Sequence, residues 1–166
     1  MSALVSNQKT FAGCYAFGKA AEGTALAQLQ NSPVWAGLEI NRSVNDKDTY
    51  DYITPCGLRF EMKTRRNTKR AFPTTIMPMA KGLANGEGSI FLFNFTDGLY
   101  YIVFNKAFFD ENCYTDEIEA ADRPDANPEM PKWHWLIPHW LLRRVSDGEM
   151  DEWPPSIKQR WQITTY

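Results

Sequence analysis

The chain has 166 residues and a mass of 19.1 kDa, enough for one domain with a sizeable core, and its 43% hydrophobic content excludes a disordered chain. Its 20 acidic side chains outnumber its 18 basic ones, which excludes a protein that binds polyanions through overall positive charge. No stretch approaches the ~20 apolar residues of a membrane span, and no signal-peptide pattern is seen, so we expect a soluble cytoplasmic protein with no membrane partner.

The first predicted element is a helix over residues 6 to 31, where apolar side chains recur at three- and four-residue steps until Pro33 approaches. Glu22 lies on the apolar stripe of this helix, because Ala25 and Leu29 follow it at three and seven residues. A carboxylate that points inward needs a partner, so Glu22 is a candidate functional residue.

A strand and a hairpin are predicted next. Residues 34 to 44 alternate between two sets of side chains with the two-residue period of a strand. Residues 49 to 54 and 58 to 64 are short runs rich in aromatic and β-branched side chains, and the turn-like sequence Pro-Cys-Gly joins them.

The later elements are predicted in chain order as a short helix and a loop within residues 71 to 88, strands at 89 to 95 and 99 to 105 joined by Asp97-Gly98, an exposed acidic loop at 112 to 131, an alternating strand within 133 to 145, and a last helix that begins at Pro154 or Pro155. The two histidines, His134 and His139, have aromatic neighbours and no metal-binding spacing. We expect both to be packing residues.

The first hairpin separates charged from apolar side chains. If the Pro-Cys-Gly turn forms its loop, Tyr52 pairs with Phe60 and Asp51 stands directly across from Glu61. Period-two alternation puts Glu61 and Lys63 on one face of their strand. The sequence therefore predicts two carboxylates and an ammonium group side by side.

Two adjacent carboxylates repel each other, so they need a shared proton, a cation or the neighbouring Lys63. Oxygen atoms from two carboxylates, waters and a phosphate suit Mg²⁺, with Mn²⁺ as a further candidate. Glu22 adds a third carboxylate if its helix packs near the hairpin. Four basic residues after Lys63 are expected to bind nucleic-acid phosphates: Arg65, Arg66, Lys69 and Arg70.

The chain contains, in this order, a helix with an inward glutamate, a strand with an aspartate and a strand with a Glu-x-Lys triplet. This order resembles that of the PD-(D/E)XK nuclease superfamily. The resemblance covers about residues 6 to 105. It implies an α/β (α+β) protein of restriction-endonuclease-like fold, with an αβββαβ core in which helices flank a central mixed sheet.

The same resemblance implies a metal-dependent enzyme that hydrolyses phosphodiester bonds in DNA, as an endo- or exodeoxyribonuclease. In that reading Asp51 and Glu61 are the Mg²⁺ ligands, and Lys63 is the catalytic lysine. Glu22 corresponds to the carboxylate of the first helix.

We expect a single domain over residues 1 to 166, in which residues 106 to 166 extend the core, and a homodimer, because cutting both strands of a duplex commonly takes two sites. Two other hypotheses stay open. A non-catalytic nucleic-acid-binding module on the same fold would close Lys63 into an ion pair with Asp51 or Glu61. An unrelated α+β protein would place Glu22 far from Asp51.

Overall fold

The computed structural model describes residues 11–45, 48–118 and 132–152. The helices are α2 (Phe11–Asn31), α3 (Met79–Asn85) and α4 (Lys106–Asn112), with 3₁₀ helices at Pro33–Trp35, Lys69–Ala71 and His139–Leu141. The strands are β1 (Asn41–Arg42), β2 (Tyr52–Ile53), β3 (Arg59–Thr64), β4 (Thr74–Pro78), β5 (Ile90–Phe95), β6 (Gly98–Val103), β7 (Tyr114–Ile118), β8 (Lys132–Pro138) and β9 (Arg143–Arg144).

The protein is a mixed α/β structure whose larger sheet has mixed strand orientation. This six-stranded sheet has the order β1-β2-β3-β5-β6-β9, in which β3 and β5 run parallel and the other neighbours are antiparallel. A second, antiparallel sheet has the order β4-β8-β7. The chain makes the parallel crossover from β3 to β5 through β4 and α3.

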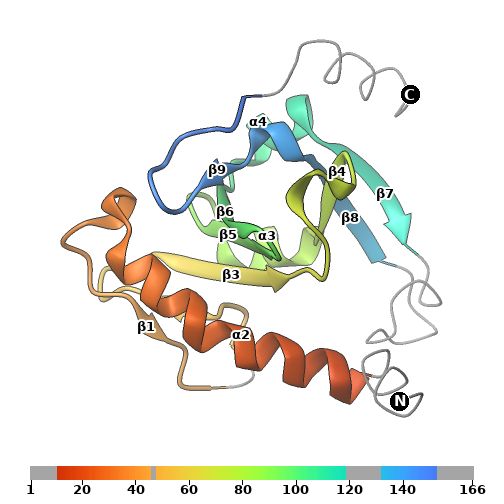
Figure 1. The fold of residues 1–166 in the computed structure, drawn as a ribbon. Coiled ribbons are helices and arrows are strands. Elements are labelled where there is room, and N and C mark those ends of the chain that lie inside the picture. The colour runs from red at the N-terminus through yellow and green to blue at the C-terminus, as the bar shows by residue number, and fades with distance from the viewer. Residues whose placement is uncertain (1–10, 46–47, 119–131, 153–166) are drawn as a thin grey trace.

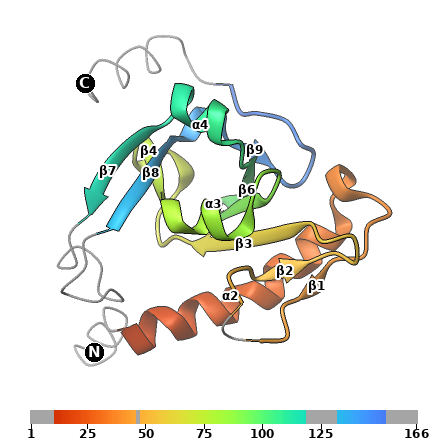
Figure 2. The ribbon, with the colours of Figure 1, turned by 180° about the vertical axis from the view of Figure 1, so that it is seen from behind.

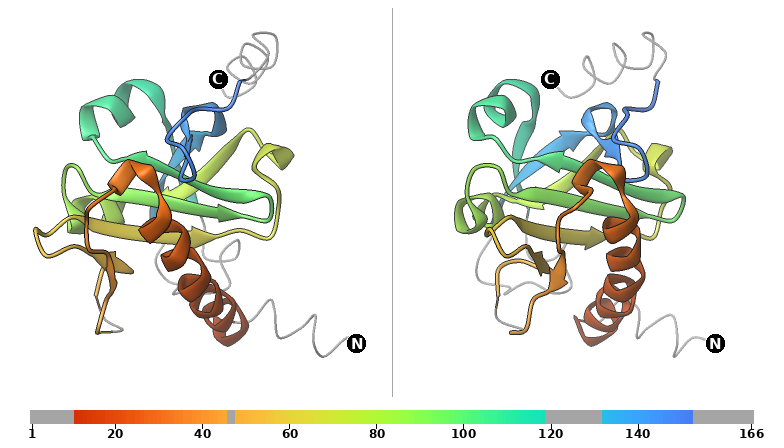
Figure 3. Two further views of the ribbon diagram at one scale, coloured as in Figure 1. Left: turned by 60° about the vertical axis from the view of Figure 1, so that its left-hand side comes forward. Right: turned by 90° about the vertical axis from the view of Figure 1, so that its left-hand side faces the viewer.

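Side chains of the central strands alternate between two cores, one on each face of the larger sheet. Phe60, Met62 and Leu92 pack with Ala25 and Leu29 of α2. The alternate side chains of β5 pack with residues from β4 and β8 in the second core. Figure 3 shows α2 crossing one face of the sheet, and Figure 1 shows the smaller sheet on the other side of β3. Seen from behind, α3 lies beside β3 on the side away from α2 (Figure 2).

Four predicted elements are confirmed within the described residues. The first helix, predicted over residues 6–31, is present as α2 from Phe11, while residues 6–10 lie outside the described residues. Its buried stripe includes Glu22, Ala25 and Leu29. In the first hairpin Tyr52 pairs with Phe60, as the turn-based register requires. The second hairpin is formed by β5 and β6. Within residues 71–88 the expected short helix is α3, but the rest is not all loop, because Thr74–Pro78 pairs with β8 as strand β4.

The strand predicted over residues 34–44 is wrong except for β1. The hydroxyl of Ser32 accepts a hydrogen bond from the N–H of Val34 and caps a 3₁₀ turn at the expected start of the strand. Gly37 then has a φ of 82°, which breaks an extended conformation. Local capping and turn geometry thus override the period-two pattern.

The acidic segment also differs from its prediction. Residues 114–118, expected in an exposed loop, form β7 because they pair along the edge of β8. Asp116 and Glu117 are nevertheless exposed, as expected. Residues 119–131 of that predicted loop, and the predicted last helix after Pro154, lie outside the described residues.

The alternating strand predicted within residues 133–145 is present as β8, which ends at Pro138, and β9 then adds an edge to the larger sheet. His134 and His139 are buried, as expected for packing residues. In the described part of the chain, no helix has both the length and the apolar character that a membrane crossing requires.

Candidate functional site

Asp51 lies at the point where the first hairpin leaves its regular ladder. Its N–H donates to the carbonyl oxygen of Phe60, the residue that is already paired with Tyr52, so two residues of one strand oppose one of the other. Such a bulge re-aims a side chain. The Asp51 carboxylate accepts a hydrogen bond from the N–H of Met62 at 2.7 Å. Asp51 is therefore not directly across from Glu61, as a regular ladder requires. Its carboxylate is instead hydrogen-bonded to Met62, the residue between Glu61 and Lys63.

The environment of Asp51 disfavours its negative charge. Burial and the nearby Glu61 carboxylate raise its pKa from 3.8 to about 7, and Glu22 adds to the shift. The hydrogen bond from Met62 and the charge of Lys63 act in the opposite direction. Because Asp51 lies near two like charges, a bound cation or a proton would stabilise it.

Glu61 is buried on the face of β3 turned toward the second core, at 4% exposure. One of its carboxylate oxygens lies 3.2 Å from the ammonium nitrogen of Lys63 and 3.3 Å from that of Lys81. Both lysine side chains keep about a third of their surface exposed, at 29% and 31%. The carboxylate is thus held inside the protein, while its two ammonium partners reach solvent.

Glu22 projects from α2, on the other face of the sheet. Its carboxylate lies 2.9 Å from the guanidinium of Arg42 and 3.6 Å from the ammonium group of Lys19. The backbone carbonyl of Glu22 accepts the hydroxyl hydrogen of Tyr52, which ties the helix to the hairpin. Arg42 is thus the partner that the buried carboxylate of Glu22 required. The Glu22 carboxylate is also close enough to raise the pKa of Asp51.

The predicted residues do not all form one ligand set. Asp51, Glu61 and Lys63 come together at the bulge, and Glu22 acts on Asp51 electrostatically from the other side. Among the residues that the structure describes, no group of three or more His, Cys, Asp or Glu side chains is arranged to hold a metal ion. A metal at this site would therefore rely on two carboxylates, with waters and a substrate oxygen completing its shell.

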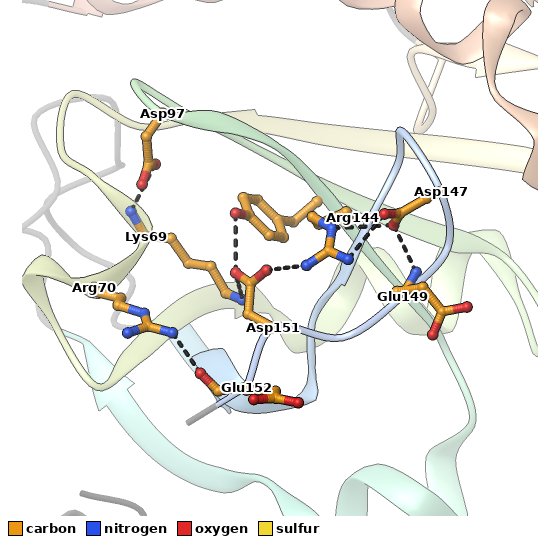
Figure 4. A network of polar contacts seen from close by, with 9 residues as sticks. Lys69, Arg70, Asp97, Arg144, Asp147, Glu149, Asp151 and Glu152 are labelled. Carbon is orange, nitrogen blue, oxygen red and sulfur yellow. Dashed lines mark hydrogen bonds and ion pairs between the residues drawn. The ribbon is translucent and has the colours of Figure 1, made fainter. Parts of the chain in front are cut away.

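Lys69 does not lie at the surface, where a phosphate contact was expected. It is 1% exposed, and its ammonium group lies 2.8 Å from the carboxylate of Asp151 and 4.3 Å from the ring centre of Tyr100. Its backbone N–H donates to Asp97 (Figure 4). Burial lowers the pKa of Lys69, which is an interior ion-pair partner.

The other members of the basic run also have structural contacts. Arg65 donates to the hydroxyl of Thr75 and to the carbonyl of Ile76, and it stacks over Phe93. Arg70 is exposed and donates to the carbonyl of Glu152 (Figure 4). Arg66 is exposed. The surface charge left for a polyanion is therefore smaller than the sequence suggested.

The sequence interpretation missed Lys81 and Arg42. Lys81 is 20 positions after Glu61 on α3, and no spacing rule links a helix lysine to a strand glutamate across a crossover connection. Arg42 lies on β1, the only part of the strand predicted over residues 34–44 that the described structure contains. The only signal for Arg42 was the requirement that a buried glutamate have a partner.

Comparison of the chain with models of known protein families found no match, and comparisons with curated proteins and with solved structures found none either.

Proposed function

We propose that the protein is a Mg²⁺-dependent nuclease that hydrolyses phosphodiester bonds in DNA. The observation that carries the proposal is the Asp51 carboxylate, which is bonded to the Met62 N–H and has a pKa raised to about 7 by burial and by Glu61. Lys63 completes the site at 3.2 Å from Glu61. A carboxylate whose pKa is strongly perturbed by burial and by a neighbouring charge is a candidate functional residue.

The chain order supports a PD-(D/E)XK-type site on a restriction-endonuclease-like core. A helix, three strands that form an antiparallel meander, a second helix and a strand parallel to the third occur as α2, β1, β2, β3, α3 and β5, with β4 of the smaller sheet inserted between β3 and α3. The family pattern places its carboxylates and its lysine on the second and third of these strands. Here Asp51 lies directly before β2, and Glu61 and Lys63 lie on β3.

The donor set fits Mg²⁺ or Mn²⁺, because Asp51 and Glu61 offer hard carboxylate oxygens whose mutual repulsion a divalent cation would relieve. When bound, such an ion would supply a Lewis acid for the negative charge that develops on the phosphoryl group. The chain itself supplies the placement. Lys63 lies beside both carboxylates, where it can orient the attacking water as an ammonium group or accept its proton as the neutral amine.

A second candidate function has its own supporting observation. Lys63 and Lys81 both pair with the same oxygen of Glu61, and a closed Lys63 ion pair is the feature expected of a non-catalytic nucleic-acid-binding module. The two hypotheses differ in whether a divalent cation displaces the lysines from Glu61. The exposure of both lysine side chains favours displacement, since each can swing toward solvent.

The test is a cleavage assay on supercoiled plasmid, linear duplex, single-stranded and branched DNA with Mg²⁺, Mn²⁺ or EDTA. We expect metal-dependent cutting by the wild type and its loss in Glu61→Gln and Lys63→Ala, with Lys106→Ala, which removes a lysine paired with Asp110 instead of Glu61, as the control. Metal-dependent turnover that survives in either site variant would refute the proposed mechanism. No cutting, with salt-dependent DNA binding in all proteins, would favour the binding module.

We also propose that two chains act together as a homodimer on duplex DNA. The mass of the protein in solution, alone and with DNA, tests this. A monomer that makes double-strand breaks in one encounter would contradict it.

A further inference from the structure

The contact between Lys81 and Glu61 brings a residue of the crossover helix into the site. The Lys81 ammonium group lies 3.3 Å from a Glu61 carboxylate oxygen, and it arrives from α3, on the side of β3 away from α2 (Figure 2). Lys63 reaches the same oxygen from the strand itself. Two ammonium groups from two elements thus converge on one buried carboxylate.

The position of Lys81 is fixed by its neighbours on α3. Gly82 packs so closely under Phe104 that an added Cβ would lie 2.7 Å from the ring. The Thr49 hydroxyl donates to the side-chain oxygen of Asn85, and the Asn85 side-chain N–H donates to the Thr49 carbonyl oxygen. The helix is therefore anchored both to the second core and to the segment that leads into β2.

We propose that Lys81 binds a phosphate group of DNA at the Asp51–Glu61 site, an inference that rests on the nuclease function proposed above. Once Glu61 serves as a metal ligand, its single negative charge no longer balances two ammonium groups. A phosphodiester oxygen supplies the negative charge that replaces it.

Lys81 rather than Lys63 takes this part because of the charges around each lysine. Lys63 flanks Met62, whose N–H holds the Asp51 carboxylate, so Lys63 stays beside a second negative group. Lys81 approaches from the opposite element with its side chain 31% exposed. Among the described residues its ammonium group pairs with Glu61 alone, so it can follow a ligand that enters from solvent once Glu61 binds the metal.

The test measures DNA binding in addition to cleavage. A short fluorescein-labelled duplex is titrated with wild type, Lys81→Met, Lys81→Arg and Lys106→Met across a series of salt concentrations, by fluorescence anisotropy, in EDTA and in Ca²⁺. Losing one phosphate contact should weaken binding and reduce the slope of log K against log salt concentration by about 0.9 in Lys81→Met. Lys81→Arg, which keeps the charge, should retain the wild-type slope.

Lys106 is the matched control because it is an exposed lysine whose ammonium group pairs with Asp110 of its own helix, α4, and not with Glu61. An unchanged affinity and slope in Lys81→Met, or an equal loss in Lys106→Met, would overturn the assignment. If circular dichroism shows that Lys81→Met does not fold, Lys81→Gln is measured in its place. Cleavage that persists in Glu61→Gln would instead refute the nuclease proposal, whatever Lys81 does.

Discussion

Asp51 is an acidic residue in surroundings that disfavour its negative charge. Its carboxylate is buried near Glu61 and Glu22, and these surroundings raise its pKa to about 7, so its charged form is less favoured at neutral pH than that of an ordinary carboxyl group. One backbone N–H, from Met62, holds it in place. Groups of this kind cost stability and are retained where function needs them.

The first prediction concerns this cost. The folded protein binds the Asp51 proton more tightly than the unfolded chain, so the free energy of unfolding should fall as pH rises from about 4 to about 7. Asp51→Asn removes the charge and keeps an oxygen to accept the Met62 N–H. Urea unfolding near pH 8 should show a gain on the order of 1–2 kcal/mol, from 1.36 kcal/mol per pKa unit opposed by the remaining contacts.

Below about pH 4 the Asp51→Asn gain should vanish, because the wild-type carboxyl is then protonated in both states. Asp147→Asn is the control of opposite sign, since Arg144 lowers the pKa of Asp147 through hydrogen bonds. An Asp51→Asn variant that is less stable than wild type at pH 8 would show that the site does not strain this carboxylate.

At the scale of elements, the site depends on where α3 lies against the sheet. The helix has seven residues, too few to be stable without tertiary packing. Its buried face is made by Gly82 against Phe104, where a side chain has no room. The position of Lys81 beside Glu61 is thus a consequence of a glycine one residue later.

Gly82→Ala should move α3, because its Cβ would lie within 3 Å of the Phe104 ring. We expect a loss of about 1–3 kcal/mol in the free energy of unfolding, the usual cost of overpacking, together with weaker DNA binding. Gly18→Ala in α2 is the matched control. A Cβ at Gly18 meets nothing within 4 Å, so that variant should be more stable by roughly 0.5–1 kcal/mol. Equal effects in both variants, measured by urea unfolding, would contradict the packing argument.

At the scale of the whole molecule, a polar network joins the connection between β3 and β4 to the segment around β9 (Figure 4). Asp151 accepts hydrogen bonds from Lys69, Tyr100 and Arg144, and these partners lower its pKa to about 2 although burial acts to raise it. Arg144 also donates to Asp147. Segments 82 residues apart in sequence are held together by one carboxylate.

Asp151→Asn should destabilise the protein by about 3 kcal/mol at neutral pH, the lower end of the cost of breaking a buried ion pair, because it leaves the Lys69 ammonium group buried without its charge partner. A folded-state pKa below the unfolded value means that this stabilisation is present above about pH 4 and is lost as pH falls toward 2. Acid unfolding should therefore be flatter in Asp151→Asn than in wild type. Asp110→Asn, which removes an exposed ion pair, should cost less than 1 kcal/mol.

The sequence predicted what depends on local periodicity and turn chemistry. The stripe of α2, the pairing of Tyr52 with Phe60 and the second hairpin all follow from neighbours within a few residues. It did not predict the bulge at Asp51, because Tyr50, Asp51 and Tyr52 still alternate between apolar and charged side chains as in a regular strand. It also could not predict that Lys69 is buried, because the ion-pair partner that offsets the cost of burying its charge is Asp151, far along the chain.

The proposed nuclease function depends on the two carboxylates beside Lys63. The measurement that tests it most directly is cleavage of supercoiled plasmid with Mg²⁺ or EDTA by wild type, Asp51→Asn and Asp147→Asn, each confirmed as folded. We predict that wild type and Asp147→Asn cut the plasmid only with Mg²⁺, and that Asp51→Asn does not cut it although it is the more stable protein. Cutting by Asp51→Asn at the wild-type rate, or by wild type in EDTA, would contradict the proposed site.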